Sequence, residues 1–284
     1  KRIIEPLTLM GAQIESDDFK APLRISGKKL HAIEYTSKLS SAQVKSAILL
    51  AGLRTDGKTS FTEPSQSRDH TELMLSYMGA NIHTDGLKTT IEKSSLEPKT
   101  IEIAGDISSA AFFMAGALIV PESKITLKNV GLNPTRTGII DVIKKMNGNI
   151  EILDKRKVSN EYTGDIRVST SDLKACNISG DIIPRIIDEI PIIAVLATQA
   201  DGTTVISDAQ DLRNKESDRI KAIVTELKKL GADIEETPGG IIINGKTNLK
   251  GECEINTYQD HRIAMSLYIA GLVCQKEILI KDFD

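Results

Sequence analysis

The sequence predicts an α/β protein of repeated units, in which strands lie outside helices that are apolar on every side. Two observations lead to this fold class. One helix ending recurs along the chain and reads Met or Leu, two small residues and then a strand, at Met10, Met78, Met146 and Leu230. Between these endings lie helical stretches made almost wholly of small and apolar residues. A chain of 284 residues with 40% hydrophobic residues can bury such helices in packed cores.

Each repeated ending closes an amphipathic helix. Before the ending at Leu230, for example, apolar residues recur at the three- and four-residue spacing of one helix face, at Ile220, Ile223, Val224 and Leu227. Glycine follows three of the four endings, at Gly11, Gly79 and Gly231. Because a left-handed glycine commonly ends a helix, we expect these helices to stop there.

The apolar helices alternate with the amphipathic ones. They are predicted over residues 41–53, 108–120, 190–200 and 262–273. A short strand is expected after each, over residues 59–62, 124–130, 203–207 and 277–280. A helix that is apolar all round must be buried on every side, so the pattern favours buried helices with sheets outside them over a doubly wound sheet. The glycine-rich fingerprints G-x-G-x-x-G and G-x-x-x-x-G-K-[ST] are absent, so nothing supports a nucleotide site.

Bulk properties exclude several classes of partner and compartment. A net charge of -3 and a pI near 5.9 give no global attraction for nucleic acid or anionic membrane, so any anion site must be local. Cys176, Cys253 and Cys274 lack the spacing of a disulfide framework or a zinc site, which fits a reducing cytoplasm. No apolar run approaches the roughly 20 residues that span a bilayer. The chain begins at Lys1 in a helical pattern, so we expect sequence upstream to be missing.

Cationic side chains stand at the starts of predicted helices. Lys215 and Arg219 lie four residues apart where one helix begins, and His261 and Arg262 follow a predicted N-cap at Asp260. A helix N-terminus is partly positive, so these cations are unfavourable there unless an anion is nearby. Taken singly, each of these cations is more simply explained as a solvated surface charge. Their recurrence favours one or more bound phosphates or carboxylates.

Two further cations fall near helix starts in the first half of the chain. Arg68 precedes an Asp-x-x-Glu pattern, Asp69 to Glu72, which predicts a capping box. Lys45 lies early in the predicted helix over residues 41–53 and belongs to the same recurrence. The histidines His31, His70 and His83 lack the spacing of metal ligands, so we read them as structural or surface residues. For Arg136, in a predicted turn before a helix, we prefer a structural role.

Carboxylates and hydroxyls supply the other ingredients of a polar site. Asp188 and Glu189 open the helix over residues 190–200, where ordinary capping explains them. Glu216 has cations on both sides within its turn, so it could act as a base or an acid. The run Ser40-Ser41-Ala42-Gln43 predicts an N-cap that would also suit a phosphate or a polyol.

Six motifs in order carry a resemblance to a known family. They are SAQVKSA at residues 41–47, SRDHTE at 67–72, GDISSA at 105–110, DEIP at 188–191, LRNKESDR at 212–219 and DHRIAM at 260–265. The chain closely resembles the 5-enolpyruvylshikimate-3-phosphate synthases along essentially its whole length. That resemblance implies a two-lobed enolpyruvyl transferase fold, an inside-out α/β barrel of repeated βαβαββ units with buried helices. Residues 1–104 would form part of the N-terminal lobe and residues 105–284 most of the C-terminal lobe.

The resemblance also implies an activity. The 5-hydroxyl of shikimate 3-phosphate would add to C2 of phosphoenolpyruvate, and phosphate would leave from the tetrahedral adduct, in the shikimate pathway to chorismate and aromatic amino acids. No metal or organic cofactor, nucleic acid or membrane is implied, and we expect a cytoplasmic monomer.

The family's site residues carry over to matching positions of this sequence. Shikimate 3-phosphate contacts are expected from Ser40, Ser41, Gln43, Arg68, Asp188 and Lys215. Phosphoenolpyruvate contacts are expected from Gln43, Arg219, His261 and Arg262. Asp188 would accept the proton of the 5-hydroxyl, and Glu216 would take part in proton transfer at the methylene carbon. The guanidinium groups match the geometry of carboxylate and phosphate.

The sequence departs from the family at both ends, which leaves two alternatives open. The family carries a Lys-Ser-x-x-x-Arg motif upstream of the position of Lys1 and a further helix past Asp284. We therefore expect little or no turnover from this chain alone, and an inactive fragment is one alternative. The other is the related UDP-N-acetylglucosamine enolpyruvyl transferase. That family uses a reactive cysteine in a context that none of the three cysteines here occupies.

Overall fold

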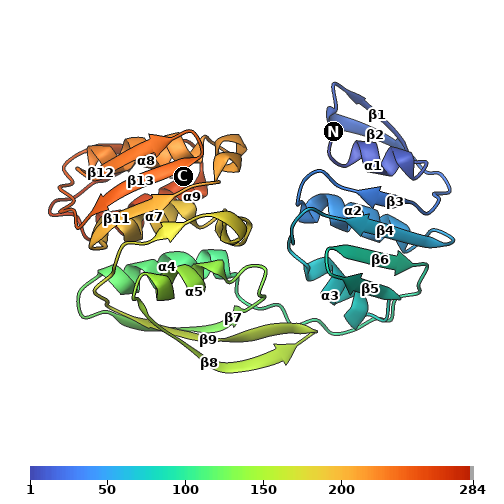
Figure 1. Cartoon of the computed structure of the whole chain (residues 1–284), viewed down its shortest axis with the longest axis horizontal. Coiled ribbons are helices and arrows are strands. Elements are labelled where there is room, and N and C mark those ends of the chain that lie inside the picture. The colour runs from blue at the N-terminus through green and yellow to red at the C-terminus, as the bar shows by residue number, and fades with distance from the viewer. Residues whose placement is uncertain (282–284) are drawn as a thin grey trace. The chain divides into compact units, whose positions relative to one another are not determined.

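The computed structural model describes residues 1–281 and divides into two compact units (Figure 1). The first comprises Lys1–Ile103 together with Lys157–Glu161, and the second comprises Ala104–Arg156 and the chain from Tyr162 onward. The predicted α/β class is confirmed, with helices and mixed sheets alternating along the chain. None of the described sheets closes on itself.

The first unit opens with helix α1 (Ile4–Leu9) and the antiparallel hairpin of β1 (Gln13–Asp17) and β2 (Lys20–Ser26). One βαβαββ repeat follows. Its elements are β3 (Glu34–Thr36), α2 (Ala42–Gly52), β4 (Lys58–Thr62), α3 (His70–Tyr77), β5 (Ile82–Asp85) and β6 (Lys88–Glu92). The four strands form one sheet in the order β3-β4-β6-β5, with β3 and β4 parallel and the other pairs antiparallel.

The second unit repeats this pattern. Its first repeat contains α4 (Ile107–Ile119), β7 (Lys124–Gly131), α5 (Gly138–Lys145), β8 (Asn149–Val158) and β9 (Glu161–Ser169), with an isolated parallel bridge from Gly105 to Val130 where a first strand would pair. The tip of the β8–β9 hairpin belongs to the first unit, where Asn160 donates to the carbonyl of Leu73 at 3.0 Å.

The next repeat has the strand order β10-β11-β13-β12, which matches the sheet of the first unit. Its elements are β10 (Asn177–Ile178), the 3-10 turn η1 (Gly180–Ile182), α6 (Ile183–Ile186), α7 (Ile190–Gln199), β11 (Gly202–Ile206), the 3-10 turn η2 (Gln210–Asn214), α8 (Arg219–Lys229), β12 (Asp233–Thr237) and β13 (Gly240–Gly245). A final β–α–β segment contains β14 (Glu254–Asn256), α9 (His261–Gly271) and β15 (Leu279–Lys281). The last strand lies slightly later than the predicted residues 277–280.

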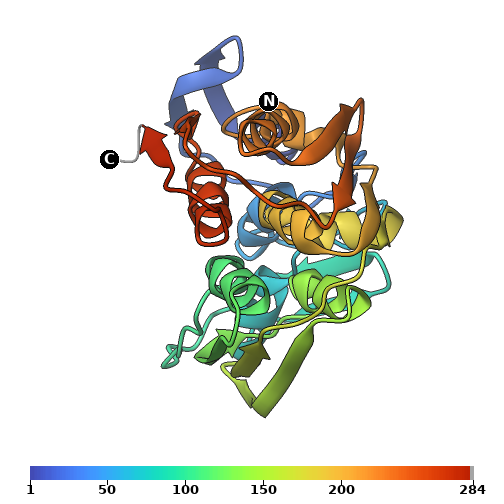
Figure 2. The same ribbon diagram turned by 90° about the vertical axis from the view of Figure 1, so that its left-hand side faces the viewer.

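Buried helices form the core of the second unit, as the sequence predicts. Residues 190–198 of α7 are all buried, and α7 packs against α4, α8 and α9 (Figure 2). An all-apolar helix is stable only when neighbours surround it, which these three helices and strand β13 provide. The starts of α8 and α9 are thereby brought next to the start of α7, and each of these starts carries a charged motif.

The repeated helix ending is a Schellman cap in every copy. Gly11, Gly79, Asn147 and Gly231 have left-handed φ angles of 95°, 88°, 62° and 91°. In the copy after α1, the amide of Ala12 donates to the carbonyl of Leu7, and the amide of Gly11 donates to that of Thr8. This pairing satisfies the last carbonyls of the helix and turns the chain into the following strand.

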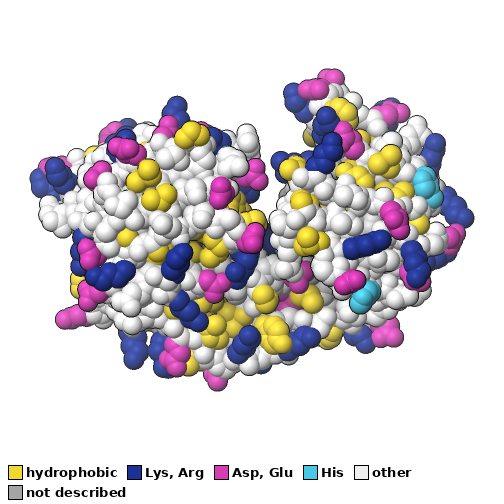
Figure 3. Space-filling model, viewed as in Figure 1, with side chains coloured by type: hydrophobic (Ala, Val, Ile, Leu, Met, Phe, Trp, Pro, Cys, Tyr) yellow, Lys and Arg dark blue, Asp and Glu magenta, His cyan; other side chains and the backbone are white. Residues whose placement is uncertain are grey.

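Charges of both signs are interspersed over the face shown in Figure 3, with no large area of one sign. This distribution agrees with the small net charge of -3. No helix among residues 1–281 is long and apolar enough to cross a membrane.

Candidate active site

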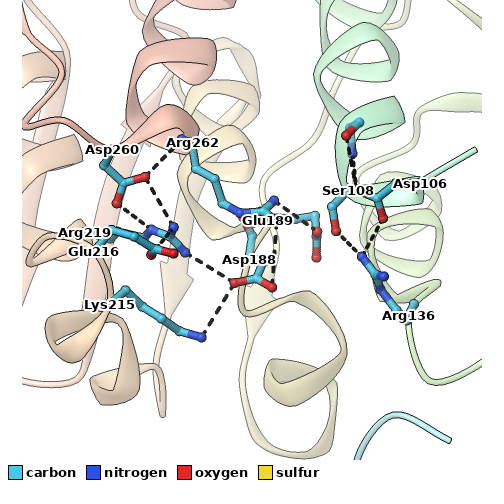
Figure 4. Close-up of polar contacts among 11 residues, drawn as sticks. Asp106, Ser108, Arg136, Asp188, Glu189, Lys215, Glu216, Arg219, Asp260 and Arg262 are labelled. Atoms are coloured by element: carbon cyan, nitrogen blue, oxygen red, sulfur yellow. Dashed lines mark hydrogen bonds and ion pairs between the residues drawn. The ribbon is translucent and has the colours of Figure 1, made fainter. Parts of the chain in front are cut away.

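The charged helix starts of the second unit form one connected cluster (Figure 4). Its centre is Arg219, the first residue of α8, whose side chain is 1% exposed. The Arg219 Nε and Nη2 atoms donate to both carboxylate oxygens of Asp260 at 2.8 and 3.3 Å. Its Nη1 donates to Asp188 Oδ1 at 3.3 Å, and its Nη2 also donates to Glu216 Oε2 at 2.5 Å. One guanidinium therefore joins three carboxylates from three parts of the chain.

Asp188 lies among three cations. Its Oδ1 is 3.6 Å from Lys215 Nζ and 3.3 Å from Arg219 Nη1, and its Oδ2 is 3.9 Å from Arg262 Nη2. Arg262 also donates to the backbone carbonyl of Asp188 at 3.3 Å. The expected capping of α7 by this Asp-Glu pair is wrong, because Glu189 occupies the N-cap position without a side-chain cap and Asp188 faces the cations instead.

Glu216 and the two outer cations are the more accessible members of the cluster. The Glu216 side chain is 53% exposed although it binds the buried Arg219. Lys215 and Arg262 keep part of their surface exposed, and His261, the first residue of α9, is exposed. These groups can therefore meet a ligand, whereas Arg219 is largely covered.

Asp260 is fully buried and serves two helices. It caps α9 by accepting from the Arg262 amide at 3.0 Å, as the sequence predicts, and it also accepts from the Ser217 hydroxyl at 3.0 Å. Burial acts to raise the pKa of Asp260, but the hydrogen bonds and charge of Arg219, with the Arg262 amide and Ser217, outweigh it and hold that pKa below its ordinary value of 3.8.

Glu189 is a buried carboxyl group of the cluster, and its burial disfavours the ionised form. Burial raises its pKa above the ordinary 4.5, although Ser108 and Arg262 act in the opposite direction. Its Oε1 lies 3.8 Å from Arg262 Nη1 and has no hydrogen-bond partner among the described residues.

Arg136 forms an ion pair at the start of α4 near the cluster, which is compatible with the structural role preferred on sequence grounds. Its Nη2 donates to Asp106 Oδ1 at 2.7 Å and to the Ser108 hydroxyl at 2.6 Å, at the start of α4. Burial opposes ionisation of Asp106, but Arg136 and the groups at the start of α4 outweigh it and lower the pKa. Asp106 and Ser108 belong to the GDISSA motif found in the sequence. Nothing in the local sequence indicates that they contact Arg136.

The predicted residues of the first unit surround the start of α2. Ser41 caps α2 by accepting from the Val44 amide at 3.5 Å, and Gln43 is exposed on its first turn. The Ser40 hydroxyl donates to the Ser65 carbonyl at 2.7 Å, which joins the helix start to the loop before α3. Arg68 follows in that loop and is half-buried. The structure thus links Ser40, Ser41 and Gln43 to the segment that carries Arg68.

Two expectations for this unit are wrong. Asp69 precedes α3 without a side-chain cap, and the expected capping partner Glu72 instead binds Lys45 at 2.7 Å. Lys45 is almost fully buried and also binds Glu63 at 2.9 Å. The anions that accompany this cation are therefore the protein's own carboxylates, because the α2 start turns Lys45 inward. Burial raises the pKa of Glu72, against the hydrogen bond and charge of Lys45.

Among residues 1–281, no group of three or more His, Cys, Asp or Glu is arranged to hold a metal ion. The guanidinium, ammonium and carboxylate groups of the cluster can bind anions and transfer protons.

The chain is similar to known proteins along its whole length. The family model for EPSP synthase (3-phosphoshikimate 1-carboxyvinyltransferase) matches residues 1–284. The chain is 52% identical to the 3-phosphoshikimate 1-carboxyvinyltransferase of Bacillus licheniformis over 281 residues, and 56% identical to that of Geobacillus thermodenitrificans over 274 residues. These matches cover 98% and 95% of this chain, and 66% and 63% of the relatives.

A solved structure of EPSP synthase from Acinetobacter baumannii is also similar, with a TM-score of 0.91 and 42% sequence identity. The match covers 99% of this chain and 65% of that one. The chain spans about two thirds of the length of the curated relatives and solved structures that it matches.

Proposed function

This chain belongs to the EPSP synthase (3-phosphoshikimate 1-carboxyvinyltransferase) family, and on that premise we propose that it acts in enolpyruvyl transfer. The proposed reaction moves the enolpyruvyl group of phosphoenolpyruvate to the 5-hydroxyl of shikimate 3-phosphate and releases phosphate. It would be a transferase step in the shikimate pathway, with both substrates as partners.

One observation carries this proposal. A carboxylate, Asp188, lies among the cations Lys215, Arg219 and Arg262, and a second, more exposed carboxylate, Glu216, binds the same Arg219 guanidinium. The reaction needs this combination, because both substrates are anionic and protons must move at two different atoms. Cations alone would bind the substrates, whereas the carboxylates supply the proton transfers.

We assign the roles in the second unit as follows. Asp188 accepts the proton of the 5-hydroxyl as the oxygen bonds to C2 of phosphoenolpyruvate, and it also binds shikimate 3-phosphate with Lys215. Glu216 delivers a proton to the methylene carbon and recovers it when phosphate leaves the tetrahedral adduct. Arg219, His261 and Arg262 hold phosphoenolpyruvate, with the exposed parts of His261 and Arg262 making the direct contacts.

In the first unit we propose that Ser40, Ser41, Gln43 and Arg68 contact shikimate 3-phosphate, and that Gln43 also approaches phosphoenolpyruvate. The bond from Ser40 to Ser65 supports a shared site, because it joins the helix start to the loop that carries Arg68. Residues 1–104 would then serve the shikimate 3-phosphate side and residues 105–284 the phosphoenolpyruvate side.

The test combines binding with turnover. Calorimetry with each substrate should detect binding to the 284-residue chain, and phosphate release should require both substrates. Failure to bind either substrate would refute the proposal. Phosphate release with UDP-N-acetylglucosamine as the acceptor, and none with shikimate 3-phosphate, would assign the chain to the other enolpyruvyl transferase.

We further propose that the protein works in the cytoplasm as a monomer. Three free, partly buried cysteines are in keeping with a reducing compartment. Gel filtration with light scattering measures the oligomeric state, and a dimer mass would refute this part.

A further inference from the structure

The segment before α9 has an unusual backbone. Tyr258 and Gln259 have φ angles of 56° and 54°, so two consecutive residues with side chains occupy the left-handed region that glycine prefers. This conformation is unfavourable for such residues and persists only where other contacts enforce it. The next residues are Asp260, His261 and Arg262 of the candidate site, so whatever enforces this backbone also fixes where those side chains stand.

Glu226 of α8 makes the contacts that can enforce it. Its side chain is fully buried, and its Oε2 accepts from the Asn256 amide at 3.0 Å while its Oε1 accepts from the Tyr258 hydroxyl at 2.7 Å. Lys229 Nζ lies within 2.9 Å of both oxygens. The carboxylate is thus neutralised and bonded to two points of the segment that leads into α9.

Two residues of helix α8 therefore hold the segment of residues 256–260. Glu226 and Arg219 are two helical turns apart and so lie on the same face of α8. Glu226 binds Asn256 and Tyr258, and Arg219 binds Asp260. The three contacts follow the chain in order, which orients the start of α9 relative to α8.

We propose that Glu226 and Tyr258 are positioning residues, which together hold the left-handed backbone of residues 258–259 and so place Asp260, His261 and Arg262. Neither touches a residue to which we give a proton-transfer role. The consequence for ligand binding rests on the function proposed above, whereas the consequence for local structure does not.

The main test is Tyr258→Phe, which removes one hydrogen bond and leaves the ring in place. Hydrogen exchange of the amides of residues 257–262 should become about tenfold faster, the effect of losing one bond to a charged group. Exchange in α4 and α7 should stay unchanged. Affinity for phosphoenolpyruvate should fall while affinity for shikimate 3-phosphate is kept. Tyr268→Phe is the matched control, because Tyr268 is an exposed tyrosine of α9.

Glu226→Gln is the second variant. Its control is Glu235→Gln, because Glu235 is an exposed residue of strand β12 in the same unit. Glutamine has one acceptor oxygen where glutamate has two, so it can accept from the Asn256 amide or from the Tyr258 hydroxyl but not from both. Hydrogen exchange at residues 256–262 should again accelerate locally. Exchange as slow as in the two controls would overturn the proposal. If the unaltered chain binds no phosphoenolpyruvate while local exchange still accelerates, the proposed function fails and the positioning role stands.

Discussion

Arg219 Nε and Asp260 Oδ2 lie 2.8 Å apart, and both side chains are almost completely buried. Arg219→Lys should therefore destabilise the protein by about 3 kcal/mol, because lysine cannot bond both oxygens of Asp260 and the removal of one partner leaves a buried charge poorly compensated. Urea unfolding at pH 7 measures this loss.

Arg167→Lys is the matched control for that change. Arg167 pairs with Glu151 at 3.2 Å, and both side chains are about half exposed, so the change should cost less than about 0.5 kcal/mol. Equal losses in the two variants would contradict the importance given to the buried pair.

Asp260→Asn should destabilise the protein in a pH-dependent way. The pKa of Asp260 is held below its ordinary 3.8, so its ionised form stabilises the fold above that value, and the contribution is lost as the pH falls through the lower folded pKa. The difference in unfolding free energy between the protein and this variant should be full at pH 5 to 7 and shrink below pH 3.8. Asp172→Asn, at a side chain that is 95% exposed, should give no such dependence.

Lys45→Met tests the buried charges of the first unit. The change leaves Glu63 and Glu72 buried without their cation, so we expect a loss of about 3–5 kcal/mol at pH 7. Without Lys45 the folded pKa of Glu72 rises further above its ordinary value, so the loss should be small near pH 4.5 and grow as the pH increases. Urea unfolding at pH 4.5 and at pH 7 measures this loss of unfolding free energy.

The control for Lys45→Met is Lys58→Met, which removes an exposed lysine paired with Glu92 at 3.1 Å. Its effect should be within about 0.5 kcal/mol and independent of pH over this range. A deficit of Lys45→Met that is the same at pH 4.5 and pH 7 would contradict the assignment.

The periodic features of this fold could be predicted from sequence because they are local. The left-handed residue after each amphipathic helix and the apolar run of residues 190–198 are decided by neighbours along the chain. The same holds for the cap of α9 by Asp260, which bonds an amide two residues away.

The partners of the charged groups could not be predicted, because they are distant in sequence. Lys45 at a helix start looks like an anion-binding residue, and only the packing of β4 and α3 against α2 reveals Glu63 and Glu72. Arg136 meets Asp106 and Ser108 for the same reason. The Glu226–Tyr258 contact also depends on how α8 lies against the segment before α9.

Asp188→Asn and Glu216→Gln should separate turnover from binding. If each carboxylate moves a proton, phosphate release should fall by about 10²–10⁴-fold while substrate affinity changes little. Asp172→Asn and Glu235→Gln, at exposed positions, serve as controls. Unchanged turnover in both site variants would refute the two roles, and a parallel loss of affinity would make them binding groups.

Glu189→Gln should stabilise the protein at neutral pH. Burial raises the pKa of Glu189 above 4.5, so the folded state retains a proton that the unfolded chain releases. Stability should consequently fall as the pH rises from 4.5 through the higher folded pKa. Glutamine keeps the neutral shape beside Ser108 and Arg262 and escapes this fall, so the variant should match the protein at pH 4 and exceed it at pH 7. Unfolding in urea at both values provides the measurement. A variant less stable than the protein at pH 7 would mean instead that Glu189 is ionised and that its 3.8 Å pairing with Arg262 stabilises the fold.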